Sequence, residues 1–219
     1  MNEQQHNTSP TNSTTRDRID PRPILDRAIA TGGPVIARVR LEQLSAPTPC
    51  SEMDVRSMLG HLVSVLDRIA ATGQGDDSFA VTETPAPNDA WSDAWTSSAR
   101  RAADAWRDDA LLEQPMALPW IQGTGAEVLT SWFSELTIHT WDLATATGQQ
   151  PNWDDSVVTA ALAASDFLPA QNRRALFEEI STAMSRDVVA IPFAEQVSIP
   201  DDALAIDRLV AWSGRDPSR

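Results

Sequence analysis

Apolar side chains recur at steps of three and four residues along most of the chain, the spacing that buries one face of a helix. The pattern is clearest after a proline-containing turn at 45–49, where Ser51 and Asp54 predict a capping box that opens a helix. Gly73 and Gly75 are expected to end this second helix. Its core face is formed by five apolar residues: Val55, Leu59, Leu62, Leu66 and Ile69.

The same spacing predicts three other main helices. The first is expected over 21–41, kinked or broken at Gly32-Gly33-Pro34, the third over 90–110, and the fourth over 126–147, closed by Gly148. Shorter helices are expected at 154–167, 173–184 and 202–212, extended pieces at 116–120 and 188–199, and a polar loop at 76–87. The pattern therefore predicts a mainly all-α protein, a four-helix bundle with a short C-terminal α+β appendage.

Length and composition narrow the organisation and the partners. We expect a disordered polar tail over 1–20, the bundle over 21–150, and C-terminal helices and short extended segments packed on it over 151–219. A formal net charge of −14 argues against nucleic acid and anionic membranes as partners. A single cysteine and a tail without the apolar stretch of a signal peptide favour a cytoplasmic protein. Monomer and homodimer both stay open.

Two histidines lie where they could bind a metal. Glu135 and His139 stand one helical turn apart beside an apolar stripe, and His61 flanks the apolar face of the second helix. If these helices are neighbours, the three side chains form a His₂Glu set with an open position, which is typical of catalytic zinc, although other divalent ions also fit. Asp142 could orient an imidazole or complete the coordination. Spacing alone leaves a surface pair or a core histidine open.

Cys50 and a glycine motif are weaker candidates. Cys50 precedes His61 by eleven residues, about 16 Å at the rise of a helix, so it is not a ligand of the same ion unless the loop folds back, and a buried structural thiol is predicted. Gly123-Thr124-Gly125 lacks the third glycine and the βαβ context of a nucleotide site.

The tryptophans and two C-terminal arginines complete the candidates. Trp120 and Trp141 are expected in the wall of a pocket near the histidines. Arg208 and Arg215 either bind a carboxylate or pair with the many acidic residues. Four tryptophans at helical spacing are predicted to belong to the core: Trp91, Trp95, Trp106 and Trp132.

Three motifs carry a family resemblance. They are PTPCSEMDVR at 47–56 with MLGHLV at 58–63, ELTIHTWDLA at 135–144, and DRLVAW at 207–212 followed by GRDP at 214–217. The first two resemble the second- and fourth-helix signatures of the mycothiol-dependent maleylpyruvate isomerase-like metal-binding family of the DinB-like superfamily. The third is similar to the ending of one actinobacterial branch.

The resemblance implies a DinB-like four-helix bundle that holds a divalent metal, usually zinc, on His61, Glu135 and His139. It further implies that the open metal position receives the thiolate of mycothiol, so that the protein is an S-transferase or isomerase. Its partners would be this low-molecular-weight thiol and a small electrophile. About seventy residues follow the fourth helix, fewer than the second domain of the isomerase has, which favours transfer to an electrophile other than maleylpyruvate.

Two alternatives are a non-catalytic metal-binding or stress-related interaction module and a purely structural helical protein. The sequence does not name the substrate.

Overall fold

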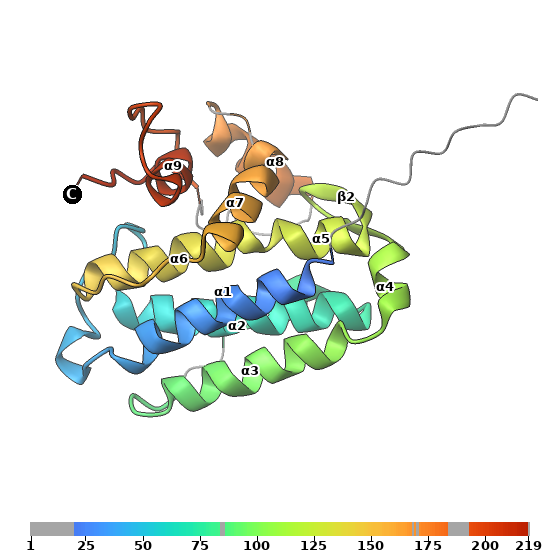
Figure 1. The fold of residues 1–219 in the computed structure, drawn as a ribbon, viewed down its shortest axis with the longest axis horizontal. Coiled ribbons are helices and arrows are strands. Elements are labelled where there is room, and N and C mark those ends of the chain that lie inside the picture. Colours follow the sequence, from blue (N-terminus) through green and yellow to red (C-terminus); the bar gives the residue numbers. More distant parts are fainter. Residues whose placement is uncertain (1–19, 84–85, 168, 170, 184–192, 219) are drawn as a thin grey trace, which may run out of the picture.

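The computed structural model describes residues 20–83, 86–167, 169, 171–183 and 193–218 (Figure 1). Nearly all of the predicted N-terminal tail and the first part of the predicted extended piece at 188–199 lie outside these residues.

Four long helices form the bundle, and their arrangement decides which side chains meet. They are α1 (Arg22–Ala37), α2 (Val55–Gln74), α3 (Trp91–Ala105) and α6 (Phe133–Ala146). Both α1 and α2 pack against α3 and α6, so each helix has two neighbours in the bundle (Figure 1). Because α2 and α6 are neighbours, side chains on their facing sides can form one site.

Shorter elements join these helices and cover one side of the bundle. They are α4 (Asp109–Glu113), β1 (Pro115–Leu118), β2 (Ile121–Thr124), α5 (Gly125–Ser131), α7 (Asp155–Ala163), α8 (Arg173–Ala183) and α9 (Ala205–Trp212), with 3-10 turns at Leu41–Gln43, Ser78–Ala80 and Ala164–Phe167. The prediction of a mainly helical protein is confirmed.

The first helix does not break at its Gly-Gly-Pro sequence, as one reading of that sequence predicted. α1 runs through Pro34 to Ala37. A Cβ atom on Gly32 would lie 2.9 Å from the Trp95 ring of α3, so this glycine permits close packing between two helices.

The start of the second helix also differs from the prediction. Asp54 is the N-cap of α2, and its carboxylate accepts a hydrogen bond from the Ser57 backbone N–H at 2.8 Å. Ser51 lies outside the helix, so the predicted Ser51–Asp54 capping box is wrong.

The predicted fourth helix is two helices, α5 and α6, which meet at Trp132. Thr124 and Glu127 form a capping box at the start of α5. Trp132 ends α5, precedes α6 and is buried. The apolar spacing continues across this junction, which is why the sequence predicts one helix.

The third helix is shorter than predicted, and the predicted extended piece at 116–120 belongs to a paired hairpin. The third helix ends at Ala105, where the buried Trp106 indole donates a hydrogen bond to the Ile69 carbonyl at 2.8 Å. The extended piece at 116–120 belongs to an antiparallel hairpin of β1 and β2, in register from Pro115 with Thr124 to Leu118 with Ile121.

The C-terminal elements lie on the α6 side of the bundle (Figure 1). α7 packs against α1, α6 and α9, and α9 also packs against α6. Residues 193–199 form no strand, contrary to the predicted extended piece, although the Val197 N–H donates to the Ala211 carbonyl at 2.9 Å. Among the described residues, no helix combines the length and the apolar character needed to cross a membrane.

Candidate metal centre

His61, Glu135 and His139 meet between α2 and α6. The Glu135 Oε1 atom lies 3.0 Å from His61 Nε2 and 3.5 Å from His139 Nε2. The imidazole rings are edge to face, with centroids 4.6 Å apart. One possible ligand atom from each residue lies within 4.8 Å of the other two. The structure thus brings together the three predicted ligands.

The site is buried, and one of its nitrogen atoms lacks a hydrogen bond. His139 is 0% exposed and His61 6%, while the Glu135 side chain is 16% exposed. His139 Nε2 is buried and has no hydrogen-bond partner. A buried polar atom without a partner is costly, and a metal ion would satisfy this one.

A carboxylate and an arginine stand behind His139. His139 Nδ1 lies 2.9 Å from Asp142 Oδ2, and Asp142 is fully buried. Arg215 binds the same carboxylate through Nη2 to Oδ2 at 2.8 Å and Nε to Oδ1 at 3.1 Å. Because an ionised carboxylate only accepts, His139 donates its Nδ1–H, and in the neutral ring Nε2 then carries the lone pair that a metal needs. We call these three residues the inner arm.

A second carboxylate stands behind His61. His61 Nδ1 lies 3.4 Å from Glu83 Oε1, and the Glu83 side chain is 45% exposed. We call His61 and Glu83 the outer arm. Sequence analysis missed Glu83, since it lies in a polar loop 22 residues after His61 and no local pattern marks it.

The charges of the cluster suit a divalent cation. With both imidazoles neutral, the Glu83, Glu135 and Asp142 carboxylates outnumber the guanidinium of Arg215 and that of Arg68, whose charge acts on His61 and Glu83. The cluster is therefore net negative, and a bound cation would reduce that charge, which matters because unbalanced buried charge is costly. The residues present therefore fit a metal ion.

Without a metal, a proton on His61 neutralises part of this negative charge. Burial lowers the pKa of His61, but hydrogen bonds to Glu135 and Glu83 outweigh burial and raise the pKa to about 9. Burial raises the pKa of Glu135, but the two imidazoles bring it well below its usual value. His61 is thus protonated at neutral pH in the metal-free protein.

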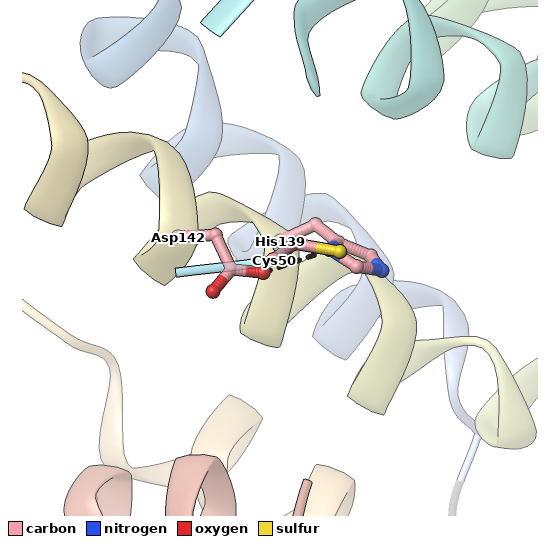
Figure 2. Close-up of side chains that lie close together, drawn as sticks. All are labelled: Cys50, His139 and Asp142. Atoms are coloured by element: carbon pink, nitrogen blue, oxygen red, sulfur yellow. Dashed lines mark hydrogen bonds and ion pairs between the residues drawn. The ribbon is translucent and has the colours of Figure 1, made fainter. Parts of the chain in front are cut away.

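Cys50 lies much closer to the site than the helical spacing predicted. Its thiol sulfur is within 4.8 Å of a ring nitrogen of His139 and a carboxylate oxygen of Asp142 (Figure 2). The estimate of about 16 Å is wrong because the segment before α2 is a folded loop rather than a helix. The Thr48 hydroxyl donates to the Cys50 carbonyl at 3.0 Å and the Met53 carbonyl at 2.8 Å, which holds the loop in place.

Cys50 nevertheless does not share the ligand set of His61 and Glu135. Its sulfur lies near His139 and Asp142 instead. The two carboxylate oxygens of Asp142 already bind the His139 imidazole and the Arg215 guanidinium. Using Cys50, His139 and Asp142 as the ligands would disrupt a buried ion pair, so the His₂Glu set is the better metal site. Cys50 is buried, as predicted, and burial raises the pKa of its thiol.

The remaining candidates lie in different surroundings. Trp120 is partly buried, packs edge to face against Trp132 with centroids 5.2 Å apart, and donates to the Ser131 hydroxyl at 3.2 Å. Trp141 is partly buried on α6, and a pocket-wall role stays a prediction for both Trp120 and Trp141. Arg208 is exposed on α9. The four tryptophans predicted in the core are buried: Trp91, Trp95, Trp106 and Trp132.

A phenylalanine that the sequence did not indicate covers one side of the site. Phe193 is buried, and its ring stacks on the His139 ring with centroids 6.3 Å apart and an interplanar angle of 16°. The Phe193 ring also packs against Trp212 and lies 5.9 Å from the guanidinium carbon of Arg215.

Comparison with known proteins shows the family of the chain. Residues 25–144, more than half of the chain, match the mycothiol maleylpyruvate isomerase N-terminal domain. The chain belongs to this family. Two uncharacterized proteins from two strains of Mycobacterium tuberculosis, Rv0738 and MT0763, are each 26% identical over 197 residues, covering 90% of this chain and 98% of each relative. No solved structure matches the chain significantly.

The family match confirms the resemblance and the DinB-like helical fold that it implies. It includes the three candidate ligands and Asp142 but ends before Phe193 and Arg215. The structure therefore adds residues from outside the matched region to the site.

Proposed function

We propose that this protein binds a divalent metal ion, zinc, at His61, Glu135 and His139 and uses it to activate the thiol of mycothiol toward a small electrophile. The reaction class is S-transfer or isomerisation. The observation that carries the proposal is the buried His139 Nε2 atom, which lacks a hydrogen bond and faces the Glu135 carboxylate. The family description, which names mycothiol and a maleylpyruvate isomerase, supports the choice of thiol.

Two histidines and one glutamate supply three ligands, the number that catalytic zinc sites use to keep one position open. When bound, zinc lowers the pKa of a thiol that occupies that position and holds it as a nucleophile.

The chain's own residues prepare this site. Asp142 accepts the His139 Nδ1–H, so the neutral ring has its lone pair on Nε2, which faces Glu135. His61 must release the proton on Nε2, the nitrogen that faces Glu135, before it can act as a ligand, while its Nδ1 faces the exposed Glu83 carboxylate. We place the activity in the cytoplasm, where low-molecular-weight thiols are kept reduced.

Cobalt substitution tests the proposal in a Cys50→Ser background, which removes the chain's own thiol. Adding mycothiol to the cobalt-loaded protein should produce a thiolate-to-cobalt charge-transfer band, and the zinc-loaded protein should join mycothiol to members of a panel of small electrophiles. His139→Ala in the same background is the matched control and should show neither signal.

Two results would contradict the proposal in different ways. Stoichiometric metal with no thiol band and no turnover would replace it with a non-catalytic metal-binding module. A protein that takes up no metal would remove its basis.

A further inference from the structure

We propose that Arg215 is a positioning residue for the metal ligand His139, acting through Asp142, so that metal binding depends on the C-terminal segment. This inference rests on the metal site of the proposed function. It goes further because Arg215 lies 71 residues beyond the end of the region that matches the family.

Arg215 fixes the Asp142 carboxylate in one orientation. Two nitrogen atoms of its guanidinium bind the two carboxylate oxygens at 2.8 and 3.1 Å, a fork that a single ammonium group cannot reproduce. This orientation directs Oδ2 toward His139 Nδ1 at 2.9 Å. A carboxylate that accepts a hydrogen bond from a ligand imidazole determines the tautomer and the orientation of the ring. Arg215 in turn fixes the orientation of the Asp142 carboxylate.

The end of α9 directs Arg215 inward. The Arg215 N–H donates to the Val210 carbonyl at 3.0 Å, and the Gly214 N–H donates to the Ala211 carbonyl at 3.1 Å, which together form a Schellman motif. Gly214 has φ +88°, and a Cβ atom there would lie 2.6 Å from the Ala194 side chain. The turn therefore requires glycine at position 214. Because of this turn, Arg215 points inward and is only 6% exposed.

The C-terminal segment that carries Arg215 also contacts the His139 ring, through Phe193. Phe193 stacks on the His139 ring, and the Arg215 guanidinium carbon lies 5.9 Å from the centre of the Phe193 ring. His139 is thus held at Nδ1 by Asp142 and on one ring face by Phe193, while Nε2 faces Glu135.

A buried ion pair could instead serve only to hold the C-terminal segment on the bundle, and Arg173 supplies a control for that role. Arg173 is 0% exposed, donates to the backbone carbonyls of Pro169 and Ala194, and stacks on the Trp212 ring at 4.5 Å. Replacing it disturbs the packing of the same segment without removing the fork on Asp142.

The test measures zinc affinity by competition with a chelator. Arg215→Met should weaken zinc binding about 10- to 100-fold, the effect expected when a group that orients a ligand is lost. Arg215→Lys, which keeps the charge but not the fork, should fall between Arg215→Met and the wild type. Arg173→Met should leave the affinity within about twofold of the wild type, because Arg173 binds backbone carbonyls and the Trp212 ring and makes no hydrogen bond to Asp142 or His139.

A double-mutant cycle separates positioning from simple support. If Arg215 acts through Asp142, adding Arg215→Met to Asp142→Asn should cause no further loss of zinc affinity. Absorption of the cobalt-saturated proteins gives a second readout. Arg215→Met should change the ligand-field bands, whereas Arg173→Met should not.

Equal losses from Arg215→Met and Arg173→Met would overturn the inference, as would an Arg215→Met effect that is undiminished in the Asp142→Asn background. If Arg215→Met does not fold, Arg215→Lys decides, and wild-type affinity in that variant overturns the inference. Tight zinc binding by both the wild type and Arg215→Met would leave the proposed function standing and remove only this inference. A wild type that binds no zinc would overturn both.

Discussion

The two arms of the metal centre place a carboxylate behind each imidazole, but in different surroundings. In the inner arm, His139 and Asp142 are fully buried, their contact is 2.9 Å, and an arginine fixes the carboxylate. In the outer arm, the contact is 3.4 Å and Glu83 is 45% exposed. One ligand, His139, is therefore built into the core, while the other, His61, contacts a carboxylate that is exposed to solvent. We expect proton exchange to occur on the outer side.

The largest expected difference between the arms concerns stability. Asp142→Asn leaves the Arg215 charge buried without its anionic partner, which should lower the free energy of unfolding of the metal-free protein by about 3–5 kcal/mol. Urea unfolding measures this, with Glu83→Gln as the matched substitution on the outer arm. A loss below about 1 kcal/mol for Asp142→Asn, the range of exposed pairs, would show that the inner arm is not the rigid one.

Metal should stabilise the protein only when both arms contribute their ligand. Zinc at a free concentration of 100 times its dissociation constant should add about 2.7 kcal/mol to the free energy of unfolding. Both His61→Ala and His139→Ala should lose this gain, which thermal unfolding with and without zinc would detect. An undiminished gain in either variant would place the metal elsewhere.

The outer arm should make metal binding depend on pH. Below a pKa of about 9, His61 is protonated, so a cation must displace that proton, and affinity should rise about tenfold per pH unit between pH 6 and 8. The rise should level off above about pH 9, where no proton remains to be displaced. Titration calorimetry in buffers of different ionisation enthalpy should find about one proton released at neutral pH. A pH-independent affinity would contradict the assignment of that proton to His61.

The smallest expected effect comes from Glu83→Gln. This exposed group should contribute less than about 1 kcal/mol to stability, and its loss should weaken zinc binding by about tenfold at most, the lower end for groups that orient ligands. Removing the Glu83 charge should also move the levelling of the affinity–pH curve to lower pH, since Glu83 raises the pKa of His61. A larger loss of affinity than in Asp142→Asn would reverse the order of the two arms.

The sequence predicted the parts of the site that depend on helical geometry. Glu135 and His139 are four residues apart on a regular helix, and His61 lies beside a regular apolar stripe, so their directions follow from the helical period. The fold class followed from the same periodicity. The break at Trp132 did not, because the apolar spacing continues across it.

The sequence could not predict contacts that depend on loops and distant segments. Arg215 lies 73 residues from Asp142, and Arg208 carries the same charge at a nearby position but is exposed. The turn at Gly214 directs Arg215 into the core, whereas Arg208 lies on the exposed face of α9. Cys50 was misplaced for a related reason, since a helical distance was applied to a loop that folds back.

Metal content is the most direct test of a metal ion at His61, Glu135 and His139. Elemental analysis should be made on protein purified without chelator and without a polyhistidine tag, beside His61→Ala and His139→Ala, with circular dichroism to confirm that the helices are retained. We expect close to one divalent ion per chain in the wild type and a large loss in both variants. No metal in the wild type after zinc is supplied, or an unchanged content in both folded variants, would contradict it.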